Sequence, residues 1–201
     1  MELHERGAAV TAMRLEEQER EALAMIDSDW MGKPAADEYP AMAERYISLV
    51  QDGSLVEALR SQEADVRELL GGLTEEQAGY RYAEGKWSLR TVMGHVVDLE
   101  RVWQYRLLRI ARGDAPAFVG YDRDAFAASS PHDRLPMAAV LRDYSAVRES
   151  TLRLLAHLSD EAMLRRGEFN GGQLSARAAA YIIAGHERHH VNVIREKYLV
   201  R

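Results

Sequence analysis

Apolar residues recur at intervals of three and four along most of this 201-residue chain, a periodicity typical of amphipathic α-helices. Only five residues are proline, and the helix-favouring residues Ala, Leu, Arg and Glu are frequent, so local propensity agrees with the periodicity. Segments with the alternating pattern of a half-buried strand are nearly absent. The sequence therefore predicts an all-α protein.

The ends of the predicted helices are marked by residues that commonly cap or break helices, such as serine before a helix and glycine after it. Helices are expected over residues 40–51, 55–70, 88–113, 136–157 and 175–199, with short helical turns after Thr74 and Ser159. Residues 114–135 form a long connection, expected to hold a short helix near 122–129, and Asn170-Gly171-Gly172 predicts a tight loop. Four long helices joined by one extended crossover make a four-helix bundle.

Residues 1–33 differ from the rest of the chain, because their apolar pattern is amphipathic but irregular and ends at Gly32-Lys33-Pro34. We interpret them as a helical N-terminal extension, and residues 34–201 as one bundle domain. The first residues lack the apolar core of a signal peptide, and no run approaches the roughly 18 apolar residues of a membrane span. The sequence therefore predicts a cytoplasmic protein without a membrane partner.

Charge and cysteine content exclude several classes of function. The formal net charge is −6, with the basic residues mixed among acidic ones, which argues against a nucleic-acid partner. The chain has no cysteine, so disulfides, thiolate metal sites, iron–sulfur clusters and a cysteine nucleophile are excluded together. Any transition-metal site must therefore use imidazole and carboxylate ligands, with water or substrate completing the shell.

The last predicted helix carries two histidines, His186 and His190, four residues apart. At this spacing two side chains share one helix face, about 6 Å apart, and can reach one metal ion. The same face continues through Ile182, Ile183 and Ile194, so the pair is expected to point into the bundle. The pair alone is a weak motif. Without a third ligand, two histidines at this spacing are as often a coincidental or partly exposed pair as a metal-binding pair.

His95 is the candidate third ligand, because it shares a helical stripe with Val92, Leu99 and Val102. A lone histidine on such a stripe is more often a hydrogen-bonded core residue, but burying three imidazoles without a ligand is costly. Three protein ligands with one open position are typical of catalytic metal sites. His189 lies about 100° from His190 around the helix, so we place it at the rim of the site rather than among the ligands. His4, His132 and His157 are expected at the surface.

Four segments together resemble the DinB/YfiT-like family of metal-dependent enzymes, a name unrelated to the DNA polymerase also called DinB. They are Glu84-Gly85-Lys86-Trp87-Ser88, Gly94-His95-Val96-Val97-Asp98-Leu99-Glu100-Arg101, Tyr105-Arg106-Leu107-Leu108-Arg109-Ile110-Ala111-Arg112-Gly113-Asp114 and Gly185-His186-Glu187-Arg188-His189-His190. The resemblance runs from about Tyr39 to the C-terminus and omits the N-terminal extension.

The resemblance implies a four-helix bundle of unusual connectivity, one divalent metal ion and frequent homodimers. His95 matches the family's first ligand, and His186 and His190 match its closing pair. Zinc or nickel is the expected ion, and manganese and iron are the alternatives, because all four accept imidazole ligands. Characterised relatives are transferases or isomerases that use a low-molecular-weight thiol such as bacillithiol or mycothiol, and others have been proposed as hydrolases.

Three further residues are candidates for a role at the site. Asp98 lies one turn after His95 and could act as an acid or base, or orient a ligand, but we favour a surface ion pair with Arg101. Arg106 and Arg109 could bind an anionic thiol or a substrate carboxylate, or equally pack against the crossover. Trp87 and Trp103 are expected in the core rather than at a substrate.

The leading hypothesis is a metal-dependent enzyme that transfers a thiol to a small electrophile. A metal-dependent hydrolase is the first alternative, since three neutral ligands leave the full charge of the metal to lower the pKa of a water or a thiol. A non-catalytic, metal-stabilised dimer acting in a stress response is the second. An enzyme should present a metal site that opens into a polar-lined pocket, whereas a structural site should be closed by a fourth protein ligand.

Overall fold

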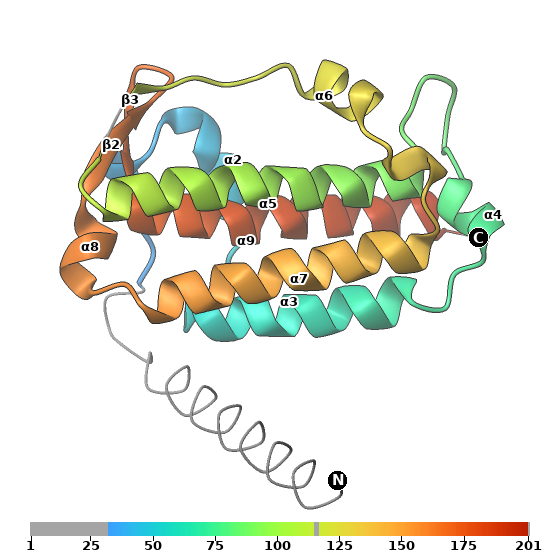
Figure 1. The fold of residues 1–201 in the computed structure, drawn as a ribbon, viewed down its shortest axis with the longest axis horizontal. Helices are drawn as coiled ribbons and strands as arrows, with labels where there is room; N and C mark the ends of the chain where they lie inside the picture. Colours follow the sequence, from blue (N-terminus) through green and yellow to red (C-terminus); the bar gives the residue numbers. More distant parts are fainter. Residues whose placement is uncertain (1–31, 115–116, 201) are drawn as a thin grey trace, which may run out of the picture.

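The computed structural model describes residues 32–114 and 117–200, and the predicted extension at residues 1–33 lies almost wholly outside this range. Most of the described chain is helical (Figure 1). The α-helices are α2 (Glu44–Ile47), α3 (Leu55–Leu70), α4 (Glu75–Gly79), α5 (Leu89–Ala111), α6 (Arg123–Ser129), α7 (Met137–Ala156), α8 (Asp160–Leu164) and α9 (Ala176–Val193). Short 3₁₀ turns cover Ala36–Glu38, Ala41–Ala43 and His132–Arg134, and a π-helical turn, Ile194–Tyr198, continues α9.

The four long helices α3, α5, α7 and α9 lie along a common direction and form the predicted four-helix bundle (Figure 1). Each of three begins where a serine side chain accepts a hydrogen bond from a backbone amide of the first turn: Ser54 before α3, Ser88 before α5 and Ser175 before α9. Such a cap satisfies one of the four free amides at a helix start. The predicted boundaries of these helices are therefore confirmed to within a few residues.

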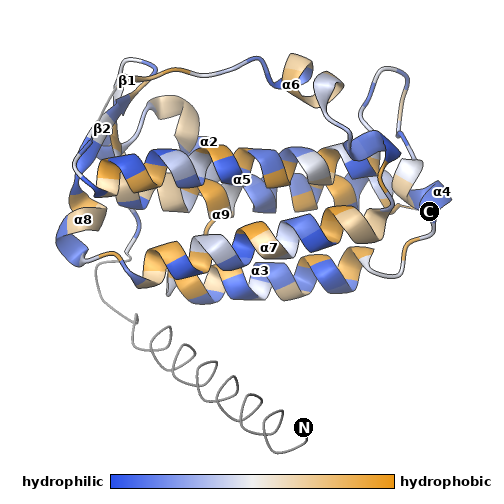
Figure 2. Cartoon of the chain, viewed as in Figure 1, coloured by the Kyte–Doolittle hydropathy of each residue, from blue (hydrophilic) through white to orange (hydrophobic). Residues whose placement is uncertain are grey.

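The core fills the space between the long helices. Figure 2 shows polar and apolar residues mixed along each of them, as expected of helices with one buried face. One buried cluster surrounds Leu59, Leu107 and Ile183, and a second surrounds Met93, Val140 and Ile194. The two clusters together span the length of the bundle, which holds α5 and α9 in fixed positions.

The segment from residue 40 to 51 is not the single helix that its apolar spacing predicts. It contains one 3₁₀ turn and the four-residue helix α2, which ends before Ser48. This short helix already buries Ile47, and Val50 is buried in the turns that follow. Because packing against α9 satisfies these apolar residues without further helical turns, tertiary structure overrides the weak helical signal.

A small sheet at one end of the bundle is a minor addition to the predicted all-α fold, and the sequence pattern did not predict it. Strand β1 (Ala117–Phe118) pairs in parallel with β2 (Arg166–Phe169), which pairs antiparallel with β3 (Gly172–Ser175). The predicted tight loop is the two-residue turn between β2 and β3, where Asn170 and Gly171 have φ values of 49° and 78°. Positive φ at both positions is typical of a type I′ hairpin turn, for which Asn-Gly is the strongest sequence signal.

The crossover between α5 and α7 passes along the outside of the bundle and contains α6, as predicted (Figure 1). Its first part adds β1 to the small sheet, and its last part carries the 3₁₀ turn His132–Arg134 against α5. Within residues 32–114 and 117–200, no helix is both long enough and apolar enough to span a membrane.

Candidate metal centre

Three histidine side chains from two helices converge inside the bundle. His95 projects from α5, and His186 and His190 project from adjacent turns of α9. The Nε2 atom of His186 lies 3.1 Å from that of His95 and 3.0 Å from that of His190. The potential ligand atoms of all three residues lie within 4.8 Å of one another. The structure thus brings together the three histidines that the spacing singled out.

A glycine precedes the histidine on each helix and lets another segment approach closely. A Cβ atom on Gly94 would lie 2.1 Å from the His132 ring, and one on Gly185 would lie 2.0 Å from the carbonyl oxygen of Tyr46. Both distances are far inside van der Waals contact, so neither position accepts a larger residue without rearrangement. The Gly-His pairs therefore let α2 and the end of the crossover pack tightly beside the histidines.

Burial keeps the three imidazoles neutral near pH 7. It lowers the pKa of His95 to about 4 and that of His190 to about 2, and it lowers the pKa of His186 well below its ordinary value. Repulsion from the neighbouring imidazoles is a second cause of the low pKa values of His186 and His190, because two positive charges at this distance repel. Neutral imidazole is the form that binds a metal ion.

The arrangement fits a metal ion better than a network of hydrogen bonds. An imidazole nitrogen has one in-plane direction, which holds either a proton or a lone pair. The Nε2 atom of His186 therefore cannot satisfy both neighbouring nitrogens at 3.0 and 3.1 Å. Two nitrogens bound to one ion at about 2.0–2.1 Å lie about 3 Å apart, so a single divalent ion would satisfy all three.

Aromatic rings surround the histidine cluster on two sides. Tyr46 on α2 contacts the rings of His186 and His189 edge-on, with centroids 5.3 and 5.7 Å apart. Trp87, directly before α5, lies against His95 with ring centroids 5.1 Å apart. These contacts fix the orientation of the imidazoles and keep water away from their sides. Trp87 is partly buried among core residues, as expected, but one side of it faces a cavity.

A cavity of about 430 Å³ opens directly beside His190. Its wall combines aromatic, apolar and charged side chains: Tyr82, Lys86, Trp87, Val92, Arg123, Asp124, His189, His190, Val193 and Tyr198, together with Gly85. His189, predicted at the rim, is half-buried there, and burial lowers the pKa of its imidazole. The size and mixed polarity of this cavity suit a small-molecule ligand.

Comparison with known proteins agrees with this geometry. The sequence profile of the DinB superfamily matches residues 58–194, which include all three histidines. The chain belongs to the DinB superfamily. The family expected from the sequence motifs is therefore confirmed.

Two similar proteins extend the comparison. A protein of Oceanobacillus iheyensis, named "putative metal-dependent hydrolase", is 23% identical over 129 residues, which are 64% of this chain and 74% of that protein. YfiT from Bacillus subtilis, described as "a probable metal-dependent hydrolase with an unusual four-helix bundle topology", superposes with a TM-score of 0.66 at 18% identity. That alignment covers 84% of this chain and 95% of YfiT, which confirms the predicted fold. The relatives and the histidine cluster together support a metal-dependent enzyme.

In this DinB-superfamily chain, Asp98 forms an ion pair with Arg101 and does not join the histidine cluster. Its carboxylate accepts a hydrogen bond from Arg101 at 3.1 Å and lies 3.7 Å from Nδ1 of His132. His132 is only 4% exposed, so the expectation that it lies at the surface is wrong. The missing side chain of Gly94 creates the space that buries this ring, a contact that no local sequence signal reveals.

Arg106 and Arg109 are engaged with the crossover and its neighbours. Arg106 donates a hydrogen bond to the carbonyl oxygen of Val119 and stacks on Trp103 and Phe169. Arg109 pairs with Asp114, 2.7 Å away. Both therefore make the packing contacts that were the alternative to anion binding, about three and four helical turns beyond His95.

Sequence reasoning did not find a buried charged network next to the histidines. Arg148 on α7, fully buried, forms ion pairs with Glu100 on α5 and Glu187 on α9 and donates to the carbonyl oxygen of Leu59 on α3. Burial alone would lower the pKa of Arg148, but the two carboxylates raise it above its ordinary value, so the guanidinium stays charged. The partners lie 48 and 39 residues from Arg148 in sequence, which hides the network from any local pattern.

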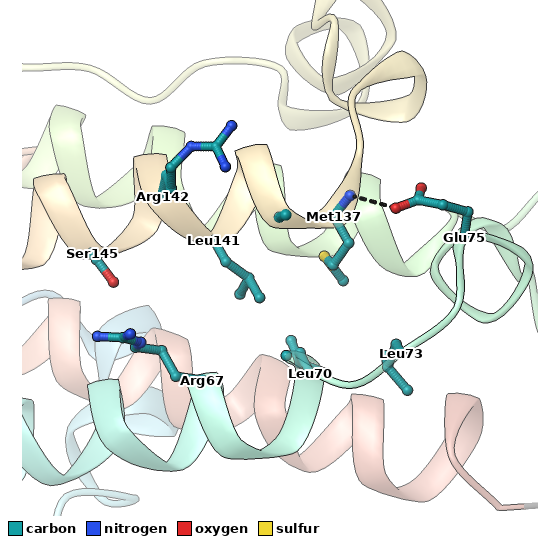
Figure 3. Close-up of a pocket in the computed structure, with 10 residues that line it drawn as sticks. Arg67, Leu70, Leu73, Glu75, Met137, Leu141, Arg142 and Ser145 are labelled. Atoms are coloured by element: carbon teal, nitrogen blue, oxygen red, sulfur yellow. Dashed lines mark hydrogen bonds between the residues drawn. The ribbon is translucent and has the colours of Figure 1, made fainter.

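A second cavity, of about 520 Å³, lies between α3 and α7 and touches none of the histidines (Figure 3). Leu70, Met137 and Leu141 form its apolar part, and Arg67 and Arg142 flank it from opposite helices (Figure 3). No histidine lines it, and Glu75 is its one carboxylate, so it lacks a set of ligands that could hold a transition metal. The smaller cavity beside His190 is therefore the candidate site.

Proposed function

We propose that this chain is an enzyme that binds one divalent transition-metal ion through His95, His186 and His190 and acts on a small molecule in the adjoining cavity. The convergence of three neutral Nε2 atoms beside that cavity carries the proposal. No fourth histidine, aspartate or glutamate of the described residues joins the cluster, which leaves a position for substrate or water, as in catalytic sites. Zinc or nickel is the proposed ion, since imidazole suits both.

When bound by three neutral imidazoles, a divalent ion keeps its full charge and can lower the pKa of a thiol or water beside it. The chain itself holds the imidazoles in their neutral form and limits the approach of water with Tyr46 and Trp87. His189 lines the cavity next to His190 and can hold or release a proton there.

Two reactions are compatible with this site. We propose the transfer of a low-molecular-weight thiol to a small electrophile as the preferred one. The ligand set contains no carboxylate, and Lys86 and Arg123 add positive charge to the cavity, which favours a thiolate. Hydrolysis is the second, and it is favoured by the names of the two relatives.

Metal analysis tests the first step. Full-length protein without a histidine tag should retain about one metal ion per chain, and His186→Ala should lose it, because the central ligand of the cluster is gone. His157→Ala is the matched control, since that histidine is exposed and far along α7 from the site. Stoichiometric metal in His186→Ala, with circular dichroism showing a folded helical protein, would overturn the proposed site.

Activity separates the two reactions. The metal-loaded protein is assayed with a panel of small thiols and a chromogenic aryl halide, and in parallel with nitrophenyl esters without thiol. Thiol transfer that disappears in His190→Ala supports the first proposal. Ester hydrolysis without any thiol-dependent reaction would replace it with the second.

A further inference from the structure

We propose that the molecule bound in the cavity beside His190 carries a carboxylate, or a group of the same charge and shape, which pairs with Arg123 while its planar or apolar body rests against Trp87. This inference depends on the proposed function, because it assigns the substrate class of the same site. It rests on the charge of the cavity, on the free guanidinium of Arg123 and on the wall that Trp87 forms.

The cavity is electropositive in a protein of opposite overall charge. The chain carries a formal net charge of −6, yet the cavity is lined by Lys86 and Arg123 against a single carboxylate, Asp124. Arg123 lines the same cavity as His189 and His190, which places its guanidinium close to the histidine cluster. A divalent ion in the centre would add to this field, so the cavity favours anions over neutral or cationic molecules.

Arg123 differs from the other arginines near the site because its side chain is uncommitted. Its one ion pair, from Nε to Asp124, is long at 3.9 Å, and the side chain is 65% exposed. Within residues 32–114 and 117–200, no side chain or carbonyl group accepts a hydrogen bond from its terminal nitrogens, whereas Arg106 and Arg148 are both held by several partners. A free guanidinium can bind a carboxylate through two parallel hydrogen bonds.

Local structure holds Arg123 at the mouth of the cavity. It is the first residue of α6, and the side chain of Asp122 caps that helix by accepting hydrogen bonds from the amides of Asp124 and Ala125. Helix α6 has no buried residue, so the cap fixes where the helix begins, and a few contacts with α5, rather than a core, set its position. The residue type at a position on such a connection can change without loss of stability of the bundle, as is common for residues that set specificity.

Another part of the cavity wall suits a planar or apolar group. Two contacts hold Trp87 in place: Tyr198 donates a hydrogen bond to its backbone carbonyl oxygen at 2.8 Å, and the ring of His95 lies against its indole ring. Val92 and Val193 add apolar surface beside it. A small carboxylic acid with a flat body can therefore reach Arg123 with its charge and Trp87 with its ring, next to the histidines.

The test compares benzoate with its neutral analogue benzamide as probes of the full-length protein. Binding is followed by NMR through the indole N–H signal of Trp87, in metal-free and in zinc-loaded protein. We expect benzoate to bind about tenfold more tightly than benzamide, and Arg123→Gln to remove most of this preference, since a charge-assisted pair is lost. Asp124→Asn should strengthen benzoate binding, because the competing carboxylate is removed. Arg142→Gln, a change in the other cavity, should leave both affinities unaltered.

Equal binding of benzoate and benzamide by the unmodified protein would overturn the inference, as would a benzoate preference that Arg123→Gln leaves intact. A further variant, Arg123→Glu, should reverse the preference towards the cation benzamidine, and failure to do so would count against Arg123. Because the probes are also measured without metal, a carboxylate preference that depends on Arg123 can be seen even if the protein binds no metal. Failure of the substrate class is thus distinguishable from failure of the metal centre.

Discussion

Two polar clusters lie side by side between α5 and α9, and they differ in how their polar groups are accommodated in the buried interior. Each joins residues from both helices: His95 with His186 in one, and Glu100 with Glu187 in the other. Arg148 pairs with both carboxylates, and burial raises the pKa of Glu187, so the network holds its charges within the protein, although Oε1 of Glu187 has no hydrogen-bond partner. The histidines are neutral, point their nitrogens at one another and face a cavity.

The difference separates structure from function in this bundle. A buried charge that is paired inside the protein contributes to a single packing arrangement. A set of donor atoms that converge without satisfying one another instead leaves a site for an ion. Neighbouring residues of α9, His186 and Glu187, belong to the two different clusters, because successive residues point about 100° apart around a helix.

The largest expected effect comes from breaking the charged network. Arg148→Met should reduce the free energy of unfolding by about 3–5 kcal/mol, because two buried carboxylates lose their counter-charge. Urea denaturation at pH 7 measures the loss. A triple variant that also carries Glu100→Gln and Glu187→Gln should recover more than half of it, since no unpaired charge is then buried. A loss below about 1 kcal/mol in Arg148→Met would mean that the network is not needed for stability.

The histidine cluster should respond to metal instead of to charge. At a free metal concentration of about 100 times the dissociation constant, binding should stabilise the folded protein by about 2.7 kcal/mol. In His186→Ala the stabilisation by metal should vanish. The metal-free variant should lose little free energy of unfolding, because the substitution also removes the cost of burying one imidazole. Thermal melts with added zinc and with a chelator measure both quantities. If zinc stabilised His186→Ala as much as the unmodified protein, the assignment of the histidine cluster to metal binding would be contradicted.

The ion pair between Glu38 and Arg177 tests whether a charge paired within the protein also contributes to stability at the edge of the bundle. Burial raises the pKa of Glu38, but hydrogen bonds from Arg177 and from the Ala35 amide outweigh this effect and lower it to about 2. The pair therefore stabilises the protein above pH 4.5 and loses this contribution as the pH falls towards 2. Glu38→Gln should be less stable than the unmodified protein at pH 7, and melts at pH 3 should bring the two closer. A constant difference would exclude ionisation of Glu38 as the cause.

The smallest effect is expected at Asp98, whose pair with Arg101 lies near the surface. Asp98→Asn should change the free energy of unfolding by less than about 1 kcal/mol, as is usual for exposed ion pairs. Turnover should fall by much less than the roughly 100-fold loss that accompanies removal of a general acid or base. A loss of 100-fold or more, with stability unchanged, would assign Asp98 to the reaction.

The two clusters also differ in how far the sequence predicts them. The spacing of His186 and His190 on one helix face, with His95 on a second apolar stripe, leads directly to the observed convergence. Arg148 cannot be found in this way, because an arginine in a helix is normally exposed and its partners are distant in sequence. The small sheet is missed for a related reason: its strands are short, and only the Asn170-Gly171 turn leaves a local signal.

The close approach at Gly185 has a practical consequence for where this domain can be cut. The family profile begins at residue 58, after α2, yet the backbone of Tyr46 occupies the space where a side chain at position 185 would lie. A fragment trimmed to the shared region would keep every histidine of the cluster and lose the ring that lies against His186. The working boundary of the metal centre therefore begins upstream of the part by which its family is recognised.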